Sequence, residues 1–228
     1  QQGDAIADVG THLVDIVQWQ CFAGVPLDYT KDIQINSARI WPTPLTLSQY
    51  ASITGKNTYP DFLKKDIVKD SILNTHANGE MNYTLKDIHV KIIARWDYKA
   101  AEGGDTHHAI VKGTKATLEI RQSKTENFKP VLYILSSGNN KDGFDAAVQE
   151  AVATIAAKYP GVNAEKQGNE WKVIIPSSYD VGHEAHFGQV MERYLQYLKA
   201  GSLPEWELSN MIVKYYTTTN AVEIATKK

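Results

Sequence analysis

Four side chains near the start of the chain have types and a spacing that could support proton transfer. They are Asp8, His12, Asp15 and Trp19. In a helix that turns about 100° per residue, these side chains project within roughly 60° of one another. A carboxylate raises the basicity of a neighbouring imidazole and fixes its tautomer, so this group could accept a proton from a substrate. A helix cap or a satisfied buried polar group is the alternative interpretation of an Asp or His here.

A helix must hold these side chains, and residues 5–22 are expected to form it. Gly24 and Pro26 follow, and both residue types end helices. Trp19 is expected to pack, and Cys21 to behave as a small hydrophobe. The apolar residues of the segment fall on another side, which we expect to face a core: Ile6, Val9, Leu13, Ile16 and Val17.

Three segments of the chain resemble one family of enzymes. Asp8-Val9-Gly10-Thr11-His12-Leu13-Val14-Asp15 resembles the D-x-G-x-H-x-x-D helix that opens the C-terminal domain in the glucose-fructose oxidoreductase, inositol dehydrogenase and MocA family. Residues 111–118 look like the family's "GTkGtl" strand turn, and residues 183–227 are similar to its closing helical segment. The resemblance therefore spans most of the chain.

The resemblance implies both a fold and an activity. The fold is α+β, with a large, mostly antiparallel sheet whose helices pack on one face, while the open face often forms a homo-oligomer. The activity is oxidation of a sugar or cyclitol hydroxyl, or reduction of the matching carbonyl, with NAD or NADP. By this analogy His12 is the general base, and Asp8 orients it or binds the substrate. Asp15 could bind substrate or assist the imidazole, or it could cap and tether a neighbouring strand.

Other histidines are candidates for substrate contact. His107 and His108 are adjacent in a predicted strand, so they point to opposite faces and at most one should meet a substrate. His183 lies at the start of a predicted helix. His183 and His186 could also bind zinc in a metal-dependent hydrolase, but their spacing differs from H-E-x-x-H and no third ligand is apparent, so no metal is expected.

The chain lacks the motifs of a nucleotide-binding fold. No G-x-G-x-x-G lies between a strand and a helix, and no equivalent of the family's catalytic lysine is recognisable. We therefore expect a C-terminal substrate-binding and catalytic half, inactive alone, that works with an N-terminal Rossmann domain of the same polypeptide. NAD or NADP would be bound mainly by that domain. A noncatalytic carbohydrate-binding or dimerisation module on the same scaffold is the alternative.

Composition excludes several classes of protein. The 228 residues are 43% hydrophobic with a net charge of −2, which allows a sizeable core but gives no general attraction to nucleic acid or anionic membranes. A single cysteine excludes an internal disulfide framework. No apolar run reaches the roughly 20 residues of a membrane span, and no signal-peptide pattern is present. We expect a cytoplasmic location, with an export signal upstream left open.

The remaining pattern predicts a single domain over residues 1–228, with an elaboration at about 124–180. A strand at 31–41 should be broken by Pro42 and Pro44. The glycines of Glu102-Gly103-Gly104-Asp105 should join two strands, 88–98 and 107–112, as a hairpin. Ser202 and Glu205 are expected to form a capping box for the last helix. The other expected strands are 71–85, 116–121, 131–136, 162–166 and 171–175, and the other helices 45–53, 142–159, 184–200 and 204–226.

Overall fold

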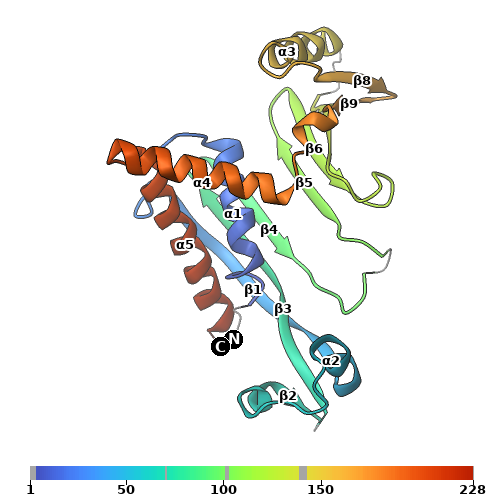
Figure 1. Ribbon diagram of the computed structural model, residues 1–228, viewed down its shortest axis with the longest axis vertical. Helices are drawn as coiled ribbons and strands as arrows, with labels where there is room; N and C mark the ends of the chain where they lie inside the picture. The colour runs from blue at the N-terminus through green and yellow to red at the C-terminus, as the bar shows by residue number, and fades with distance from the viewer. Residues whose placement is uncertain (1–3, 70, 101–102, 139–142, 228) are drawn as a thin grey trace. The chain divides into compact units, whose positions relative to one another are not determined.

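The computed structural model describes residues 4–69, 71–100, 103–138 and 143–227 (Figure 1). The backbone contacts divide the chain into two compact units: one is Gln1–Tyr98 with Gln196–Lys228, and the other is Lys99–Leu195. Each unit contains an antiparallel sheet and helices, which confirms the α+β class, although the strands belong to two sheets rather than one. Glu102 and Asp142, which the predicted hairpin and a predicted helix included, lie outside the described residues.

The sheet of the first unit is built around one long strand. The central strand pairs antiparallel with each of its neighbours. Its strands are β1 (Ile33–Thr46), β2 (Ile67–Val68), β3 (Ile72–Leu85) and β4 (Ile88–Ala94), with β3 in the middle. The predicted break at Pro42 and Pro44 is wrong, because β1 continues through both with a register shift between Trp41 and Thr43. Proline lacks an N–H, and it is tolerated here because β1 pairs with only one strand among the described residues.

Two helices, α1 (Val9–Cys21) and α5 (Glu205–Thr226), cover one face of this sheet (Figure 1). The core between them includes Met81 and Tyr83 of β3, together with Val14 and Val213, all at most 1% exposed. Burying each such side chain stabilises the fold by about 1.5–3 kcal/mol. The two closing helices and the helical state of residues 214–219 are confirmed.

The predicted core side of α1 is partly wrong. Leu13 and Val17 pack against the core as expected, but Val9 and Ile16 are exposed. The buried stripe is Gly10, Val14 and Gln18. Because α1 carries apolar residues on both sides, its hydrophobic pattern alone could not show which side meets the sheet.

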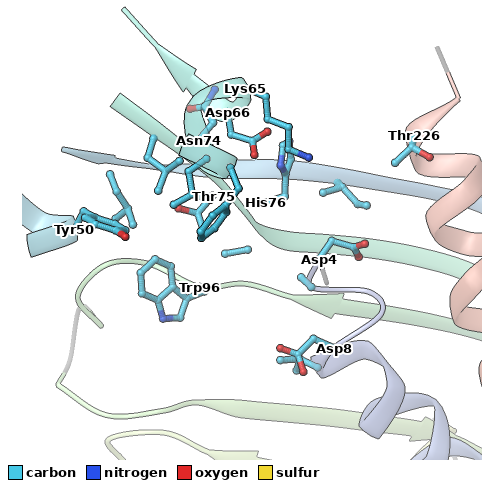
Figure 2. Close-up of a pocket in the computed structure, with 18 of the residues that line it drawn as sticks. Asp4, Asp8, Tyr50, Lys65, Asp66, Asn74, Thr75, His76, Trp96 and Thr226 are labelled. Carbon is cyan, nitrogen blue, oxygen red and sulfur yellow. The ribbon is translucent and has the colours of Figure 1, made fainter. Parts of the chain in front are cut away.

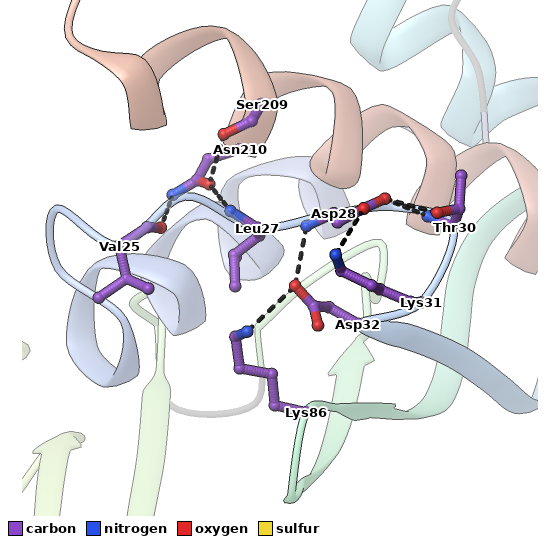
Figure 3. A network of polar contacts seen from close by, with 9 residues as sticks. All are labelled: Val25, Leu27, Asp28, Thr30, Lys31, Asp32, Lys86, Ser209 and Asn210. Atoms are coloured by element: carbon purple, nitrogen blue, oxygen red, sulfur yellow. Dashed lines mark hydrogen bonds and ion pairs between the residues drawn. The ribbon is translucent and has the colours of Figure 1, made fainter.

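A polar clamp holds the connection between α1 and β1 (Figure 3). The buried Asn210 of α5 accepts a hydrogen bond from Leu27 N at 2.9 Å and donates one to Val25 O at 3.1 Å. Further along, Asp32 pairs with Lys86 Nζ at 3.1 Å, just after β3. The loop after α1 is thus tied to α5 at one end and to the turn between β3 and β4 at the other.

A helical insertion lies between β1 and β3. It comprises α2 (Leu47–Thr54) and the 3₁₀ helix η1 (Asp61–Asp66). A capping box begins α2: Thr46 Oγ1 accepts from Gln49 N, and Gln49 Oε1 accepts from Thr46 N. The box predicted for the last helix is wrong. Its N-cap is Pro204, whose side chain has no acceptor, and no side-chain cap bond occurs there among the described residues.

The second unit contains a five-stranded antiparallel sheet. Its strands, in spatial order, are β5 (His107–Lys112), β6 (Ala116–Gln122), β7 (Val131–Ser136), β9 (Glu170–Ile174) and β8 (Asn163–Gln167). Trp171 packs with Val148 and Val152 of α3 (Phe144–Lys158). The predicted hairpin between β4 and β5 is wrong, because β4 pairs with β3 and β5 with β6. Glycines permit a turn without deciding which strands pair.

Two elements lead out of this sheet along the chain. They are the short helix η2 (Ser177–Tyr179) and helix α4 (His183–Ala200), which spans the boundary between the units. Among all the residues that the structure describes, no helix is both long enough and apolar enough to cross a membrane.

Candidate functional site

The turn that precedes α1 is held by a carboxylate other than Asp8. Asp4 Oδ1 accepts hydrogen bonds from Ile6 N at 2.8 Å and Ala7 N at 3.2 Å. Asp8 occupies the N-cap position, yet its side chain makes no cap hydrogen bond with the described residues. Asp4 thus organises the helix start, and the carboxylate of Asp8 remains available to a ligand. The cap interpretation of Asp8 is therefore wrong.

His12 lies one turn further along α1 and is exposed, as Asp8 is. Asp8 is the N-cap residue, one position before α1, rather than the helical residue that the sequence pattern predicted, and His12 lies within the helix. Trp19 is 65% exposed, so it packs little against the described residues, contrary to the expectation that it is a packing residue. Asp8 and His12 are thus both exposed to solvent, and neither is buried in the core of the first unit.

Two glycines allow the start of α1 to lie directly against the sheet. A Cβ on Gly79 of β3 would lie 2.7 Å from Ile6 Cγ1, which is too close for any side chain. A Cβ on Gly10 would lie 3.3 Å from the carbonyl oxygen of Ala5 and from Met81 Cε. Close packing at these two positions places the segment that carries Asp8 beside β3.

A cavity of about 1090 Å³ opens where this segment meets β3 (Figure 2). Asp4 and Asp8 line it from the helix start, and Asn74, Thr75 and His76 line it from β3. Trp96, residues of α2 and η1, residues of β1 and the C-terminal end of α5 form the rest of the wall. His12 lies outside the lining that the described residues form, one helical turn beyond Asp8. The cavity therefore adjoins the predicted catalytic pair through Asp8.

The polar groups of the cavity suit a ligand with many hydroxyls. Carboxylates come from Asp4, Asp8 and Asp66, and positive charge comes from Lys65 and Lys227. The buried Oγ1 of Thr75 has no hydrogen-bond partner among the described residues. Hydroxyl groups both donate and accept hydrogen bonds, so they can bond to carboxylates and to an ammonium group together.

Trp96 is held at the cavity by a buried asparagine. Asn78 Oδ1 accepts from Trp96 N at 3.0 Å, and Asn78 Nδ2 donates to Thr43 Oγ1 at 2.7 Å and to Trp41 O at 3.2 Å. Asn78 is 4% exposed, whereas Trp96 is 39% exposed. This arrangement fixes the backbone of Trp96 and leaves part of its indole open on the cavity wall, where a ring could stack.

Asp15 is engaged within the fold. Its Oδ1 lies 3.4 Å from Lys214 Nζ of α5, and both side chains are partly buried. The pair links the two helices that cover the sheet. Of the roles expected for Asp15, this contact supports tethering, but the strand expected as its partner is wrong, because Lys214 lies in helix α5.

The remaining candidate histidines belong to the second unit. On β5, His107 is half-buried while His108 is exposed, with Nε2 3.6 Å from Glu119 Oε2. A hydrogen bond from Arg121 lowers the pKa of Glu119. His183, at the start of α4, is exposed, with Nδ1 3.3 Å from Glu184 Oε1. A substrate role for these three histidines stays a prediction.

Possible metal ligands and the lone thiol were also located. Within the ranges that the structure describes, no three His, Cys, Asp or Glu side chains are grouped closely enough to hold a metal ion. Cys21 is half-buried on α1, and burial raises the pKa of its thiol.

Several cavity residues were missed by the sequence analysis. They come from separate segments, and no spacing in the sequence connects them: Asp66, Thr75, His76 and Trp96. Trp96 was one of several tryptophans with no distinguishing neighbour. Only the pairing of β3 with its neighbours brings these segments to the start of α1.

Comparison with known proteins identifies the family. Residues 1–226 match the model of the family described as "Putative oxidoreductase C terminal domain". The chain belongs to this family of oxidoreductase C-terminal domains.

A solved structure supports the same assignment. A putative oxidoreductase from Parabacteroides merdae ATCC 43184 is 45% identical, with a TM-score of 0.94 and coverage of 99% of this chain. The match covers 52% of that relative, so the chain spans about half of the relative's length. No curated protein matches the sequence.

Proposed function

We propose that this chain is the substrate-binding and catalytic half of an NAD(P)-dependent oxidoreductase that acts on a sugar or cyclitol, of the glucose-fructose oxidoreductase, inositol dehydrogenase and MocA type. The observation that carries the proposal is the pair formed by Asp8 and His12. Both are exposed, and Asp8 lines a cavity without capping the helix. Membership of an oxidoreductase domain family supports a redox role for this pair.

In the proposed reaction His12 acts as the general base. Its imidazole accepts the proton of the substrate hydroxyl while the C–O bond gains double-bond character, and Asp8 accepts a hydrogen bond that orients the substrate or the imidazolium. A nicotinamide bound by a separate nucleotide-binding half supplies the acceptor for the hydride that leaves the same carbon. In the reverse direction His12 returns the proton to the carbonyl oxygen.

The composition of the cavity supports a sugar-like substrate. Trp96 offers a partly exposed ring for the apolar face of a pyranose, and nearby carboxylates can accept hydrogen bonds from its hydroxyls. With a volume of about 1090 Å³, the cavity is at the upper end of small-molecule sites, which allows a ligand larger than one sugar ring.

The test uses the full-length protein that contains this chain. Purified wild type is offered a panel of sugars and cyclitols with NAD⁺ and with NADP⁺, and nicotinamide reduction is followed. We expect His12→Ala to lower kcat about 10²–10⁴-fold, the range for loss of a general base. Asp8→Asn should raise KM as well as lower kcat, because Asp8 contacts the substrate in this proposal.

His89→Gln is the matched control. His89 is an exposed histidine of the same unit, on β4, hydrogen-bonded to Thr84 Oγ1 at 3.3 Å and outside the cavity lining. Its replacement should leave turnover unchanged. If sugar binding is found without turnover, and His12→Ala has no effect, the noncatalytic carbohydrate-binding module is the correct alternative.

The same proposal includes a homo-oligomer through the open face of the first sheet and a cytoplasmic location. The face opposite α1 and α5 carries a row of paired charges across three strands, made by Arg39, Glu80 and Lys91. Sedimentation velocity of the full-length protein tests the oligomer, and fractionation of the cells that produce it tests the location.

A further inference from the structure

Part of the cavity beside the start of α1 is lined by aromatic side chains. Tyr50 comes from α2, Phe62 from η1 and Trp96 from the segment after β4, and we call these three residues the aromatic wall. Phe62 is 61% exposed and Trp96 is 39% exposed. In the view of Figure 2, Trp96 lies between Asp8 and Tyr50. The aromatic wall therefore leads away from the carboxylate of the proposed catalytic pair.

Helix α2 presents one side to the cavity. Its lining residues are Tyr50, Ile53 and Thr54, and a spacing of three and four residues places them on the same side of a helix. The ring of Tyr50 packs against the ring of Tyr59, with 5.0 Å between the centroids. The hydroxyl of Tyr59 in turn donates a hydrogen bond to Ser71 O at 2.9 Å. The ring of Tyr50 is thus held in place by the fold, which lowers the cost of ordering it when a ligand binds.

The segment that carries Trp96 is fixed by side chains on both sides of its backbone. Asn78 accepts a hydrogen bond from Trp96 N at 3.0 Å, and Thr43 Oγ1 donates one to Trp96 O at 2.6 Å. Two residues further on, the hydroxyl of Tyr98 lies 2.6 Å from Ser52 Oγ of α2 and forms a hydrogen bond with it. This bond joins the segment to the helix that carries Tyr50. The aromatic wall is therefore built from segments that the fold ties together.

Aromatic rings in a cavity suit a ligand with a flat apolar face. A pyranose ring and a phenyl ring both present such a face, and aromatic side chains pack against it. In the proposed reaction the reacting sugar accounts for Asp8 and Trp96, but it leaves Tyr50 and Phe62 unused. The cavity volume of about 1090 Å³ is at the upper end for small-molecule sites, so a second ring fits beside the first.

We infer that the aromatic wall is a second subsite and that the substrate is a glycoside, a sugar joined to a further ring; this inference rests on the proposed function. The reacting sugar lies beside Asp8 with one face on Trp96, and the further ring lies against Tyr50 and Phe62. That ring is a second sugar or an aromatic group, since both offer the flat apolar face that the wall fits. Contacts with this nonreacting ring hold the reacting sugar in position beside the proposed base.

The test measures binding to the full-length protein by titration calorimetry without nicotinamide. Two series of probes are used: methyl glucoside, phenyl glucoside and cellobiose in one, and methyl galactoside, phenyl galactoside and lactose in the other. In one series or both, a two-ring probe should bind about tenfold more tightly than the methyl glycoside, the scale of one aromatic contact. A gain with the phenyl glycoside alone identifies an aromatic group, and a gain with the disaccharide alone identifies a second sugar. If no two-ring probe binds more tightly in either series, the inference is wrong.

Substitution of Phe62 tests the wall directly. Phe62→Ala should raise the Kd of the two-ring probe roughly fivefold or more and leave the Kd of the methyl glycoside unchanged. Phe187→Ala is the matched control: Phe187 is 62% exposed on α4, outside the cavity lining that the described residues form, and its loss should leave both values unchanged. An unchanged Kd of the two-ring probe in Phe62→Ala overturns the inference.

Tyr50 allows stacking to be separated from hydrogen bonding. Tyr50→Phe keeps the ring and should keep the affinity for the two-ring probe, whereas Tyr50→Ala should lower it about as much as Phe62→Ala does. A loss in Tyr50→Phe equal to that in Tyr50→Ala would show that the hydroxyl, rather than the ring, contacts the ligand, and this contradicts a stacking subsite. If Tyr50→Ala fails to fold, Phe62→Ala decides alone.

The two proposals fail in different ways. A two-ring probe that binds through Phe62 but is oxidised with neither NAD⁺ nor NADP⁺ leaves the second subsite standing and refutes the proposed activity. Oxidation of one-ring sugars, with no gain from a second ring and with kcat/KM unchanged in Phe62→Ala, refutes the second subsite alone.

Discussion

Asp15 of α1 and Lys214 of α5 form an ion pair, with 3.4 Å between Oδ1 and Nζ. The side chains are 33% and 18% exposed, so water screens the pair only in part. Asp15 is one turn beyond His12 on α1. The pair therefore holds α1, the helix that carries the proposed base, against α5. Asp15, the last residue of the D-x-G-x-H-x-x-D pattern, thus has a structural partner.

Replacing Asp15 should affect stability more than chemistry. Asp15→Asn removes the attraction to Lys214 and is expected to lower the free energy of unfolding by about 1 kcal/mol, near the upper end for partly exposed pairs. Because Asp15 engages α5, kcat of the full-length protein should fall less than tenfold. Chemical denaturation and steady-state kinetics check the two values. A loss of turnover as large as that of His12→Ala would show that Asp15 takes part in the reaction.

Gly79 should tolerate no side chain. Gly79→Ala places a Cβ 2.7 Å from Ile6 Cγ1 and is expected to destabilise the protein by about 1–3 kcal/mol while raising KM, because the displaced segment carries Asp8. Thermal melts and kinetics measure both. Gly188→Ala is the control: nothing lies within 4 Å of its Cβ, and it should stabilise α4 by about 0.5–1 kcal/mol. Equal effects of the two substitutions would contradict close packing at Gly79.

Asn210 should be important for stability although it is far from the proposed base in sequence. Asn210→Ala leaves Leu27 N–H and Val25 C=O without their partner, at a cost of about 2–4 kcal/mol for two such groups. Denaturant unfolding measures the loss. Thr219→Ala, at an exposed position of α5 outside the clamp, should change stability by less than about 0.5 kcal/mol. A neutral Asn210→Ala would mean that the loop does not depend on this clamp.

Glu80 should make stability depend on pH in the acid range. A hydrogen bond from Arg39, with a further one from Lys91, lowers the pKa of Glu80 from 4.5 to about 2. Since the folded protein favours the ionised carboxylate, the contribution is complete above the unfolded pKa and is lost as pH falls from 4.5 through about 2.

The corresponding variant is Glu80→Gln. It should be about 1 kcal/mol less stable than wild type near neutral pH, and the difference should shrink as pH falls through this window. Unfolding measured across pH checks this, with Glu150→Gln on the exposed side of α3 as the control. A difference that stays constant down to pH 2 would show that the ion pairs do not hold Glu80 ionised.

Local sequence patterns predicted the helices and strands whose formation depends on residues close together in the chain. Strand β5, strand β7 and the last two helices follow from residue type and spacing, because alternation and helical periodicity act over a few residues. The placement of His12 on α1 follows in the same way. The predictions about turns and caps at Pro42, Gly104 and Ser202 were wrong, since such residues permit a structure without requiring it.

Tertiary structure alone decided which side of α1 is buried and which residues share its cavity. Apolar residues occupy both sides of α1, so only packing against Met81 and Val213 shows that Val14, rather than Val9, belongs to the core. Trp96 reaches the cavity through a hydrogen bond to Asn78, 18 residues away. Contacts between distant segments depend on strand pairing and close packing over the whole unit, and no local spacing in the chain encodes them.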